Sequence, residues 1–379
     1  MALDAEHITR TTRRPDETAD RLQDWLARTL GPGRNPVLTE VTSPESTGMS
    51  SETVLFTARW DEAGAPTERR LVARIEPPPT AHPLFRTYDL AMQFRVMRLV
   101  GEQTAVPVPE TLWYEDDPAV LGGPFFVMAQ VDGVVPPDVL PYTFDGSWVS
   151  DADPADRRRL QRSVVAAMAG IHTLTPDRFD LGFLPPAPTG TGTGTSLERL
   201  LRHWREYGDW VVQDTPSPLL SESFAWLDEH RPTEAGPDAL SWGDGRIGNM
   251  IFRDFEVVAV LDWEMASVAP PEVDLGWLCY LHLFFHDIAT DLGATGLPDL
   301  FRPVDVAAAY AEVSGRRPAD LTWFVAFAAV RLGAIMRRVT ERAVHFGEAT
   351  MPDDVDDLII HRATLRGMLD GSYWERLAF

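Results

Sequence analysis

The sequence contains no lysine and only one cysteine, and each of these facts excludes some classes of partner or site. All 34 basic residues are arginine and oppose 57 acidic residues, so the formal net charge is −23. An acidic surface repels phosphate backbones and anionic headgroups, so we expect no nucleic acid or membrane partner, whereas cationic ligands are favoured. Cys279 alone forms no disulfide framework and no cysteine-based zinc site, which fits a reducing cytoplasm.

Long apolar runs are also missing. The N-terminal residues have no apolar signal core, and the most apolar late stretch, residues 323–336, is too short to span a bilayer and is interrupted by Arg331. The segment 184–196 is a Pro, Gly and Thr loop of low complexity. With 379 residues, of which 44% are apolar, the chain is long enough for two lobes with a sizeable core. We therefore expect a cytoplasmic globular enzyme.

Hydrophobic spacing predicts a change from strands to helices along the chain. The first part reads as a helix ending at Leu30, strands over 37–41, 53–60, 69–75, 111–114 and 124–131, a hairpin loop over 61–68, and a helix over 88–100 stopped by Gly101. The later part reads as helices over 154–174, 196–213, 219–230, 274–290, 303–313, 320–344 and 353–371. This order predicts an α+β fold with a small β-rich N-terminal lobe, residues 1–131, and a large helical lobe, residues 132–379.

The polar residues most suggestive of chemistry lie between residues 240 and 278. Asp244 and Asn249 are five residues apart in a glycine-containing loop, and Asp262 follows the strand-forming run VVAVL. A hairpin of two short strands between them would fold Asp262 back beside Asn249. An amide and a carboxylate suit magnesium, which takes few protein ligands, and a second carboxylate can accept the proton of an attacking hydroxyl.

This segment resembles the catalytic and metal-binding loops of the aminoglycoside phosphotransferase and choline-kinase-like family, which has a protein-kinase-like fold. The motifs that carry the resemblance are Trp242-Gly243-Asp244, Asn249, Leu261-Asp262-Trp263-Glu264 and Asp274-Leu275. The likeness extends over most of the chain, through VLFTARW, LVARIEP, QFRVMRLV, LGGPFFVMAQVDG and AAMAGIHTL. It is closest to an actinobacterial branch of candidate aminoglycoside phosphotransferases and to kinase-like domains fused to some acyl-CoA dehydrogenases.

The resemblance implies a role for each matching residue. Asp244 would be the catalytic base, and Asn249 and Asp262 would hold Mg²⁺. Residues expected to bind the ATP or GTP co-substrate are Gly48, Ser50 and Ser51 in a phosphate-covering loop, Arg74 in the place of a strand lysine, Gln93 in the place of its helix glutamate, and Met128, Gln130 and Val131 at the hinge. The acceptor would be a hydroxyl of a small molecule.

The chain departs from the family pattern at three positions. Arg74 replaces lysine and keeps the positive charge, whereas Gln93 replaces glutamate and can only form hydrogen bonds. Trp242 replaces the histidine of His-Gly-Asp, which we expect to remove a hydrogen-bonding group that orients the loop. These departures leave open a catalytically weak nucleotide-binding pseudokinase. The retained Asp244, Asn249 and Asp262 favour an enzyme.

Several other patterns have a structural and a functional interpretation. Residues 243–248 satisfy G-x-G-x-x-G, but a dinucleotide site needs a helix directly afterwards, and a hairpin is expected instead. His282 and His286 have metal-ligand spacing, although their apolar neighbours indicate a packed helix. Glu264 and Asp274 either take part in the site or brace its loop, and His172 is expected to anchor helices.

The acceptor itself is not fixed by the sequence. The net charge permits a polycationic aminoglycoside. The region 140–230 is also rich in aromatic residues, and if some of these line the site they would favour a partly apolar acceptor such as a hydroxylated acyl compound. The oligomeric state is not indicated.

Overall fold

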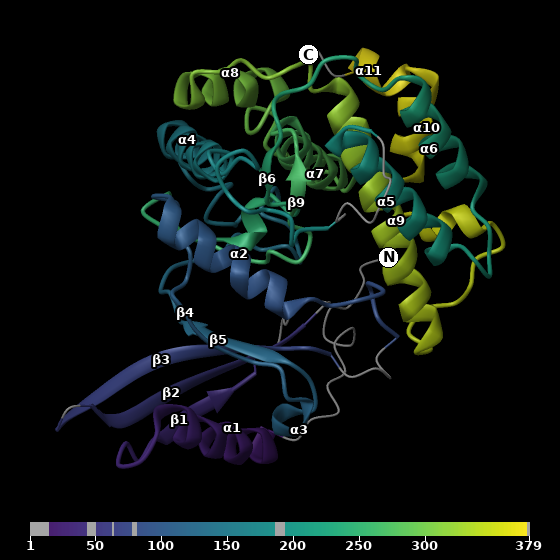
Figure 1. Cartoon of the computed structure of the whole chain (residues 1–379). Coiled ribbons are helices and arrows are strands. Elements are labelled where there is room, and N and C mark those ends of the chain that lie inside the picture. The colour runs from purple at the N-terminus through teal and green to yellow at the C-terminus, as the bar shows by residue number, and fades with distance from the viewer. Residues whose placement is uncertain (1–14, 44–50, 63, 78–81, 186–193, 377–379) are drawn as a thin grey trace. The chain divides into compact units, whose positions relative to one another are not determined.

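The structure is a computed structural model that describes residues 15–43, 51–62, 64–77, 82–185 and 194–376 (Figure 1). The chain divides into two compact units. Unit 1 comprises residues 1–101 and 109–132, and unit 2 comprises residues 102–108 and 133–379.

Unit 1 is built on an antiparallel sheet of five strands in the order β1-β2-β3-β5-β4. The strands are β1 (Val37–Thr42), β2 (Glu52–Glu62), β3 (Ala65–Ile75), β4 (Thr111–Glu115) and β5 (Phe125–Ala129), and the helices are α1 (Pro15–Leu30), α2 (Leu90–Gln103) and α3 (Pro118–Leu121). The predicted β-branched and alternating segments are strands, and the structure shows that they form one sheet.

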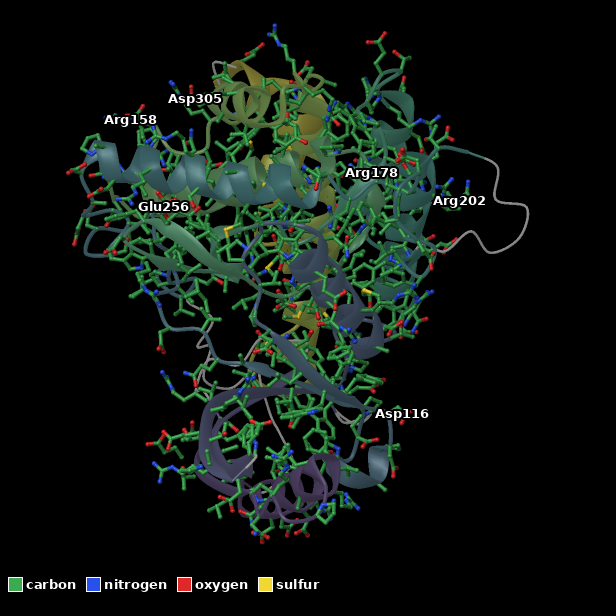
Figure 2. The ribbon with its side chains drawn as sticks, turned by 60° about the vertical axis from the view of Figure 1, so that its left-hand side comes forward. Asp116, Arg158, Arg178, Arg202, Glu256 and Asp305 are labelled. Carbon is green, nitrogen blue, oxygen red and sulfur yellow. The ribbon has the colours of Figure 1, made fainter. Side chains whose placement is uncertain are left out.

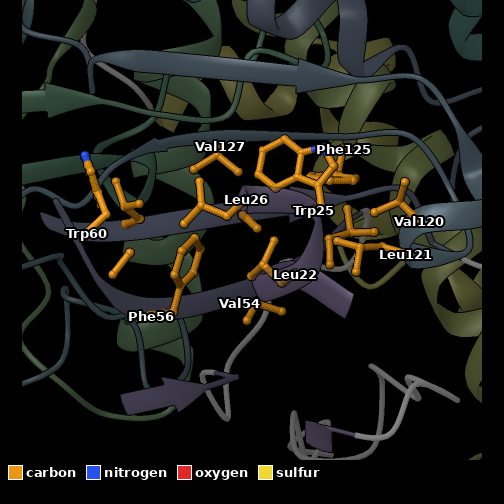
Figure 3. Close-up of a cluster of buried hydrophobic side chains, with 14 residues drawn as sticks. Leu22, Trp25, Leu26, Val54, Phe56, Trp60, Val120, Leu121, Phe125 and Val127 are labelled. Atoms are coloured by element: carbon orange, nitrogen blue, oxygen red, sulfur yellow. The ribbon is translucent and has the colours of Figure 1, made fainter. Parts of the chain in front are cut away.

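The core of unit 1 lies between α1 and one face of this sheet (Figure 3). Trp25 of α1 packs edge-on against Phe125 of β5, with ring centroids 4.8 Å apart. Its indole nitrogen donates to Glu115 over 2.9 Å, so the polar end of the ring is satisfied while its body is buried. This cluster fixes the central strands β3 and β5.

Unit 2 is mainly helical and carries two small antiparallel strand pairs. Its helices are α4 (Pro154–Ile171), α5 (Ser196–Val211), α6 (Pro218–Glu229), α7 (Glu272–Asp291), α8 (Pro303–Ser314), α9 (Thr322–His345), α10 (Arg362–Asp370) and α11 (Ser372–Arg376), with short 3₁₀ turns η2 (Ile247–Asn249) and η3 (Val355–Leu358). The strand pairs are β6 (Ala239–Ser241) with β9 (Ser267–Ala269), and β7 (Met250–Arg253) with β8 (Glu256–Val260). The sheet in unit 1 and the helices in unit 2 confirm the α+β class.

Two helices form the centre of unit 2, and a third packs on the hairpin. A Cβ at Gly276 of α7 would lie 2.6 Å from the backbone of Phe324, so only glycine allows α7 and α9 to approach this closely. Helix α4 lies on the β7–β8 hairpin, where Arg159 contacts Glu256 over 2.7 Å and Ser163 accepts from the backbone of Val257. Figure 2 shows Glu256 beside α4.

The hairpin turn between β2 and β3 and the end of α2 differ from the sequence-based predictions. The hairpin loop predicted over 61–68 is much shorter, because β2 and β3 pair as far as Glu62 and Ala65 and Gly64 adopts a positive φ of 85° at the turn. Helix α2 continues past Gly101 to Gln103. A single glycine costs a helix interior only about 1 kcal/mol, which packing of the buried face outweighs.

The helix predicted over 353–371 is broken. Only η3 and α10 form, and Ile359 between them is extended. The cause is Asp356, whose carboxylate accepts from the Ser217 hydroxyl over 2.5 Å and from the Leu219 amide over 3.3 Å at the start of α6. This buried carboxylate caps another helix, and that contact outweighs local helix propensity.

Candidate functional site

The loop that carries Asp244 begins where strand β6 ends, and one glycine sets its course. Gly243 has a φ of +90°, and a Cβ there would lie 2.1 Å from the carbonyl oxygen of Met265. Glycine is therefore required both for the backbone conformation and for the close approach of the segment that follows Asp262.

Asp274 of α7 braces the start of this loop. The fully buried carboxylate accepts from the Ser241 hydroxyl (2.7 Å) and from the backbone amides of Trp242 (2.7 Å) and Gly243 (2.9 Å). His172 Nε2 lies 3.0 Å from the same carboxylate, and its Nδ1 lies 3.1 Å from the Tyr310 hydroxyl. Burial alone would raise the pKa of Asp274, but His172 and the other hydrogen bonds outweigh it and lower that pKa.

Replacing this carboxylate should therefore cost stability. We expect Asp274→Ala to lower the free energy of unfolding by about 3–5 kcal/mol, because His172 and the three donors at the start of the loop lose a buried charged acceptor together. Ser241→Ala removes only one of these hydrogen bonds and should cost about 1 kcal/mol. Denaturant unfolding of both variants checks this, and equal losses would contradict the bracing role.

Both oxygens of Asp244 are held by side chains of unit 2. Oδ1 accepts from the indole nitrogen of Trp277 over 2.7 Å. Oδ2 accepts from the Asn249 amide over 2.7 Å and from Arg246 Nε over 3.3 Å. The same Arg246 contacts Asp138, and a Cβ at position 248 would collide with this pair, so Gly248 leaves room for it. The carboxylate is thus fixed in orientation beside a cation.

The predicted hairpin is present and brings Asn249 and the segment before Asp262 together. Met250 pairs with Val260, and the Leu261 amide donates to the Asn249 carbonyl over 2.9 Å. Asp262 follows with a φ of +57°, a conformation that aspartate tolerates better than most residues.

Trp242 corrects one expectation from the sequence. We expected the change from histidine to remove an orienting hydrogen bond, but the buried indole nitrogen donates to the carbonyls of Leu261 (2.9 Å) and Asp262 (3.1 Å). An indole N–H can only donate, and both contacts at this position require a donor. An orienting contact is therefore present, and an indole makes it.

The residues predicted to hold a metal are an amide and a carboxylate. The Asn249 nitrogen donates to the carbonyl and carboxylate oxygens of Asp244, which leaves its Oδ1 oxygen as the atom suited to a cation. Asp262 is half-buried. Within the described ranges no group of three or more His, Cys, Asp or Glu side chains is arranged to hold a metal. The donor set fits Mg²⁺, which keeps several waters and few protein ligands.

The residues predicted to bind the nucleotide lie in unit 1. Gly48 and Ser50 lie outside the described residues, and Ser51 is buried just before β2. Arg74 on β3 donates to the Thr53 hydroxyl on β2 over 3.3 Å. Gln93 on α2 is 2% exposed, and its Nε2 has no hydrogen-bond partner among the described residues.

The predicted hinge lies at the end of β5. Met128 pairs with Val72 and Thr111 inside the sheet, and the Gln130 amide donates to the Arg70 carbonyl over 2.9 Å. Within the part of the chain that the structure describes, the Val131 amide makes no backbone hydrogen bond. Val131 is therefore the residue of this segment whose N–H is available to a base edge.

The two competing motifs do not form the sites they suggest. His282 has both ring nitrogens occupied, by the Tyr142 hydroxyl and the Leu297 carbonyl, each over 2.9 Å, and burial lowers its pKa to about 4. The G-x-G-x-x-G segment leads into η2 and strand β7, without the helix that a dinucleotide site requires.

Burial raises the pKa of the Cys279 thiol. No helix in the described part of the chain is long and apolar enough to cross a membrane.

Three contributors to the site were not predicted from the sequence. Arg246 lies between Asp244 and Asn249 in the sequence, so its position in this loop could have identified it as a site residue. Trp277 and Arg331 lie in apolar helical runs that read as core, and only the packing of α7 and α9 reveals their contacts with the loop.

Solved structures share this fold. A candidate aminoglycoside phosphotransferase from Ralstonia eutropha JMP134 superposes with a TM-score of 0.66 at 23% identity, covering 94% of this chain and 98% of that one. Macrolide 2'-phosphotransferase MphH from Brachybacterium faecium gives a TM-score of 0.52 at 19% identity, covering 93% and 98%. Aminoglycoside phosphotransferase APH(4)-Ia, in a complex with AMP-PNP and hygromycin B, gives 0.54 at 15% identity, covering 93% and 98%.

Curated relatives share sequence over only part of their length. Probable acyl-CoA dehydrogenase IBR3 of Arabidopsis thaliana is 26% identical over 290 residues, which are 72% of this chain and 33% of that protein. Acyl-CoA dehydrogenase family member 11 of Gallus gallus is 30% identical over 225 residues, 59% of this chain and 26% of that protein. The chain thus spans about a third or less of these relatives. One family model matches residues 46–313, which are well over half of the sequence and include the Asp244 loop and the hairpin. The chain belongs to the phosphotransferase enzyme family.

Proposed function

We propose that the chain transfers the γ-phosphoryl group of ATP or GTP, with Mg²⁺, to a hydroxyl of a small molecule. The observation that carries this proposal is the arrangement around Asp244. Its carboxylate is held through both oxygens next to Arg246, and the hairpin brings the Asn249 and Asp262 positions to the same loop. A transfer with a loose transition state depends mainly on such positioning and on charge neutralisation.

Each side chain has a distinct part in this proposal. Asp244 accepts the proton of the attacking hydroxyl while the new oxygen–phosphorus bond forms and the nucleoside diphosphate leaves. Arg246 places a positive charge beside the base, where negative charge builds up on the transferring group. Asn249 and Asp262 would hold Mg²⁺, which neutralises phosphate charge when bound.

Unit 1 carries the residues that we propose for the nucleotide. Ser51 and Arg74 would donate to phosphate oxygens, and the Val131 amide would donate to the base. Gly48, Ser50, Gln93, Met128 and Gln130 complete the proposed set. Support comes from the related fold of APH(4)-Ia, whose solved complexes contain AMP-PNP or ADP. The proposal leaves ATP and GTP as equal candidates.

For the acceptor we propose two classes, supported by different observations. The solved neighbours are named as aminoglycoside or macrolide phosphotransferases, and one of their complexes contains hygromycin B, which supports a polyhydroxylated sugar. The curated relatives are acyl-CoA dehydrogenases, which supports a hydroxylated acyl compound that could enter or leave such a reaction. A phosphate placed on that hydroxyl would make it a good leaving group.

Unit 2 also has a cavity that is lined largely by arginines of α5 and by residues at and after the end of α6. It has a volume of about 610 Å³ and is lined by Gly194, Glu198, Leu201, Arg202, Arg205, Asp228 and Arg231. Both of its carboxylates are already paired, Glu198 with Arg231 over 3.0 Å and Asp228 with Arg205. Arg202 adds a further positive charge (Figure 2).

A screen of nucleotide consumption tests the proposed function. Purified chain with Mg²⁺ is offered amino sugars, aminocyclitols, choline-like alcohols and hydroxyacyl thioesters, with ATP and GTP in parallel. We expect an alcohol to be phosphorylated. Amino sugars should be poor substrates, and their kcat/KM should fall as salt is added. Salt screening limits the range of electrostatic attraction to about 8 Å at physiological ionic strength. Consumption of no nucleotide with any alcohol would favour a pseudokinase.

The Trp242 contact leads to a prediction about the metal site. We expect Trp242→Phe to weaken Mg²⁺-dependent nucleotide binding by about five- to twentyfold, because the ring remains but the N–H that holds the Asp262 carbonyl is lost. Trp242→His restores a ring with an N–H donor and should bind more tightly than the phenylalanine variant. Calorimetric titration with and without Mg²⁺ distinguishes them, and equal binding by all three proteins would contradict the expectation.

A further inference from the structure

We propose that Trp277 is a positioning residue for the reaction and that its indole N–H sets the orientation of the Asp244 carboxylate. This inference rests on the proposed function, in which Asp244 is the base. Trp277 is on α7, is 2% exposed, and donates from Nε1 to Asp244 Oδ1 over 2.7 Å. Among the described residues that donate to this carboxylate, Trp277 is the one that donates to Oδ1.

The Trp277 ring is itself held by a buried cation. The guanidinium carbon of Arg331 on α9 lies 4.4 Å from the Trp277 ring centroid and 4.6 Å from the Trp204 ring centroid on α5. Arg331 is 1% exposed, and its Nη2 donates to the Gly243 carbonyl over 3.0 Å. A desolvated cation stacked on indole rings is a strong contact. One arginine therefore fixes both the Trp277 ring and the peptide unit directly before Asp244.

Arg331 keeps its charge in this environment. Burial lowers its pKa to about 10, and the carboxylates of Asp274 and Asp244 act against that decrease. At neutral pH the guanidinium is protonated, so the stack with Trp277 and Trp204 is maintained under assay conditions.

The chemical consequence concerns the direction of proton transfer. A carboxylate that can rotate about its Cβ–Cγ bond presents its lone pairs in many directions. With Trp277 on Oδ1 and Asn249 on Oδ2, the plane of the Asp244 carboxylate is fixed before the acceptor binds. A base acts efficiently only within hydrogen-bond reach and in line with the proton it removes. Loss of the indole donor should therefore lower kcat more than it affects ligand binding.

Trp277 could instead serve only as core packing, and Trp204 allows the two roles to be separated. Both indoles stack on Arg331 at nearly the same distance and both are buried, but only Trp277 contacts Asp244. Phenylalanine at either position retains an aromatic ring and removes the N–H. Trp204→Phe is therefore a matched control for the loss of ring area next to Arg331.

The experiment measures kcat and the nucleotide KM of the full chain with Mg²⁺, together with thermal unfolding. For Trp277→Phe we expect kcat to fall about ten- to a hundredfold, as for loss of one hydrogen bond to a charged group, with KM within about twofold of wild type. Trp204→Phe should keep kcat within about twofold and have a similar melting temperature. Unchanged kcat in Trp277→Phe, or an equal fall in both variants, would overturn the inference.

A second measurement does not depend on the folding of the phenylalanine variant. In NMR spectra of ¹⁵N-labelled chain, Asp244→Asn should shift the Trp277 indole N–H resonance and leave that of Trp204 in place, because only Trp277 donates to residue 244. An unchanged Trp277 resonance would overturn the inference. Wild-type chain that consumes no nucleotide with any acceptor would overturn the proposed function and this inference together, whereas active wild type with unchanged Trp277→Phe overturns the inference alone.

Discussion

Asp244→Asn should reduce phosphoryl transfer by a factor on the order of 10² to 10⁴ while nucleotide affinity changes little. The amide cannot accept the proton of the hydroxyl. It also cannot satisfy every present donor, since its nitrogen must face either the Trp277 N–H or the Asn249 N–H. The measurement is single-turnover transfer to the best acceptor from the screen, with nucleotide affinity determined by titration.

The control for this variant is thermal unfolding alongside Asp254→Asn. Asp254 is an exposed aspartate in the turn of the β7–β8 hairpin, away from the Asp244 carboxylate contacts. Its variant should transfer at the wild-type rate. A folded Asp244→Asn protein that also transfers at the wild-type rate would show that Asp244 is not the base.

Asp262→Ala should abolish most of the gain in nucleotide affinity that Mg²⁺ provides, and it should do so more strongly than Asp244→Asn. The proposed magnesium site has one carboxylate, and its loss leaves only the Asn249 oxygen. Calorimetric titration of the nucleotide with and without Mg²⁺ measures this difference directly.

Asp254→Ala is the matched control for the backbone at this position. Asp262 has a φ of +57° and Asp254 has a φ of +51°, at opposite ends of the same hairpin, so alanine is strained to a similar degree at both. Backbone strain alone would reduce nucleotide affinity to a similar extent in both variants. If Asp262→Ala binds nucleotide with the same Mg²⁺ dependence as wild type, Asp262 is not a magnesium ligand.

Local pattern in the sequence was sufficient for the sheet, the hairpin and most helices. Most of the run VVAVL lies in β8, and the two polar clusters on either side of the hairpin come together because Met250 pairs with Val260. Short-range features of this kind depend on alternation and turn chemistry, both of which are visible in one sequence.

The remaining features depend on contacts between residues far apart in the chain. Asp356 interrupts a predicted helix because Ser217 and Leu219, about 140 residues earlier, need a cap. Trp277 reads as core in its apolar helix, and it is core, yet its one polar atom reaches Asp244. Nothing in the local pattern distinguishes such a tryptophan from its neighbours.

The loop around Asp244 has little regular structure of its own and is held by His172, Asp274, Trp277 and Arg331, from α4, α7 and α9 or their ends. Arg331 follows Gly243 by 88 residues, so this contact belongs to the slowly formed, non-local part of the fold. During synthesis the loop therefore emerges long before the helix that completes it. Catalytic competence should be among the last properties that the folding chain acquires, after the local hairpin and most helices have formed.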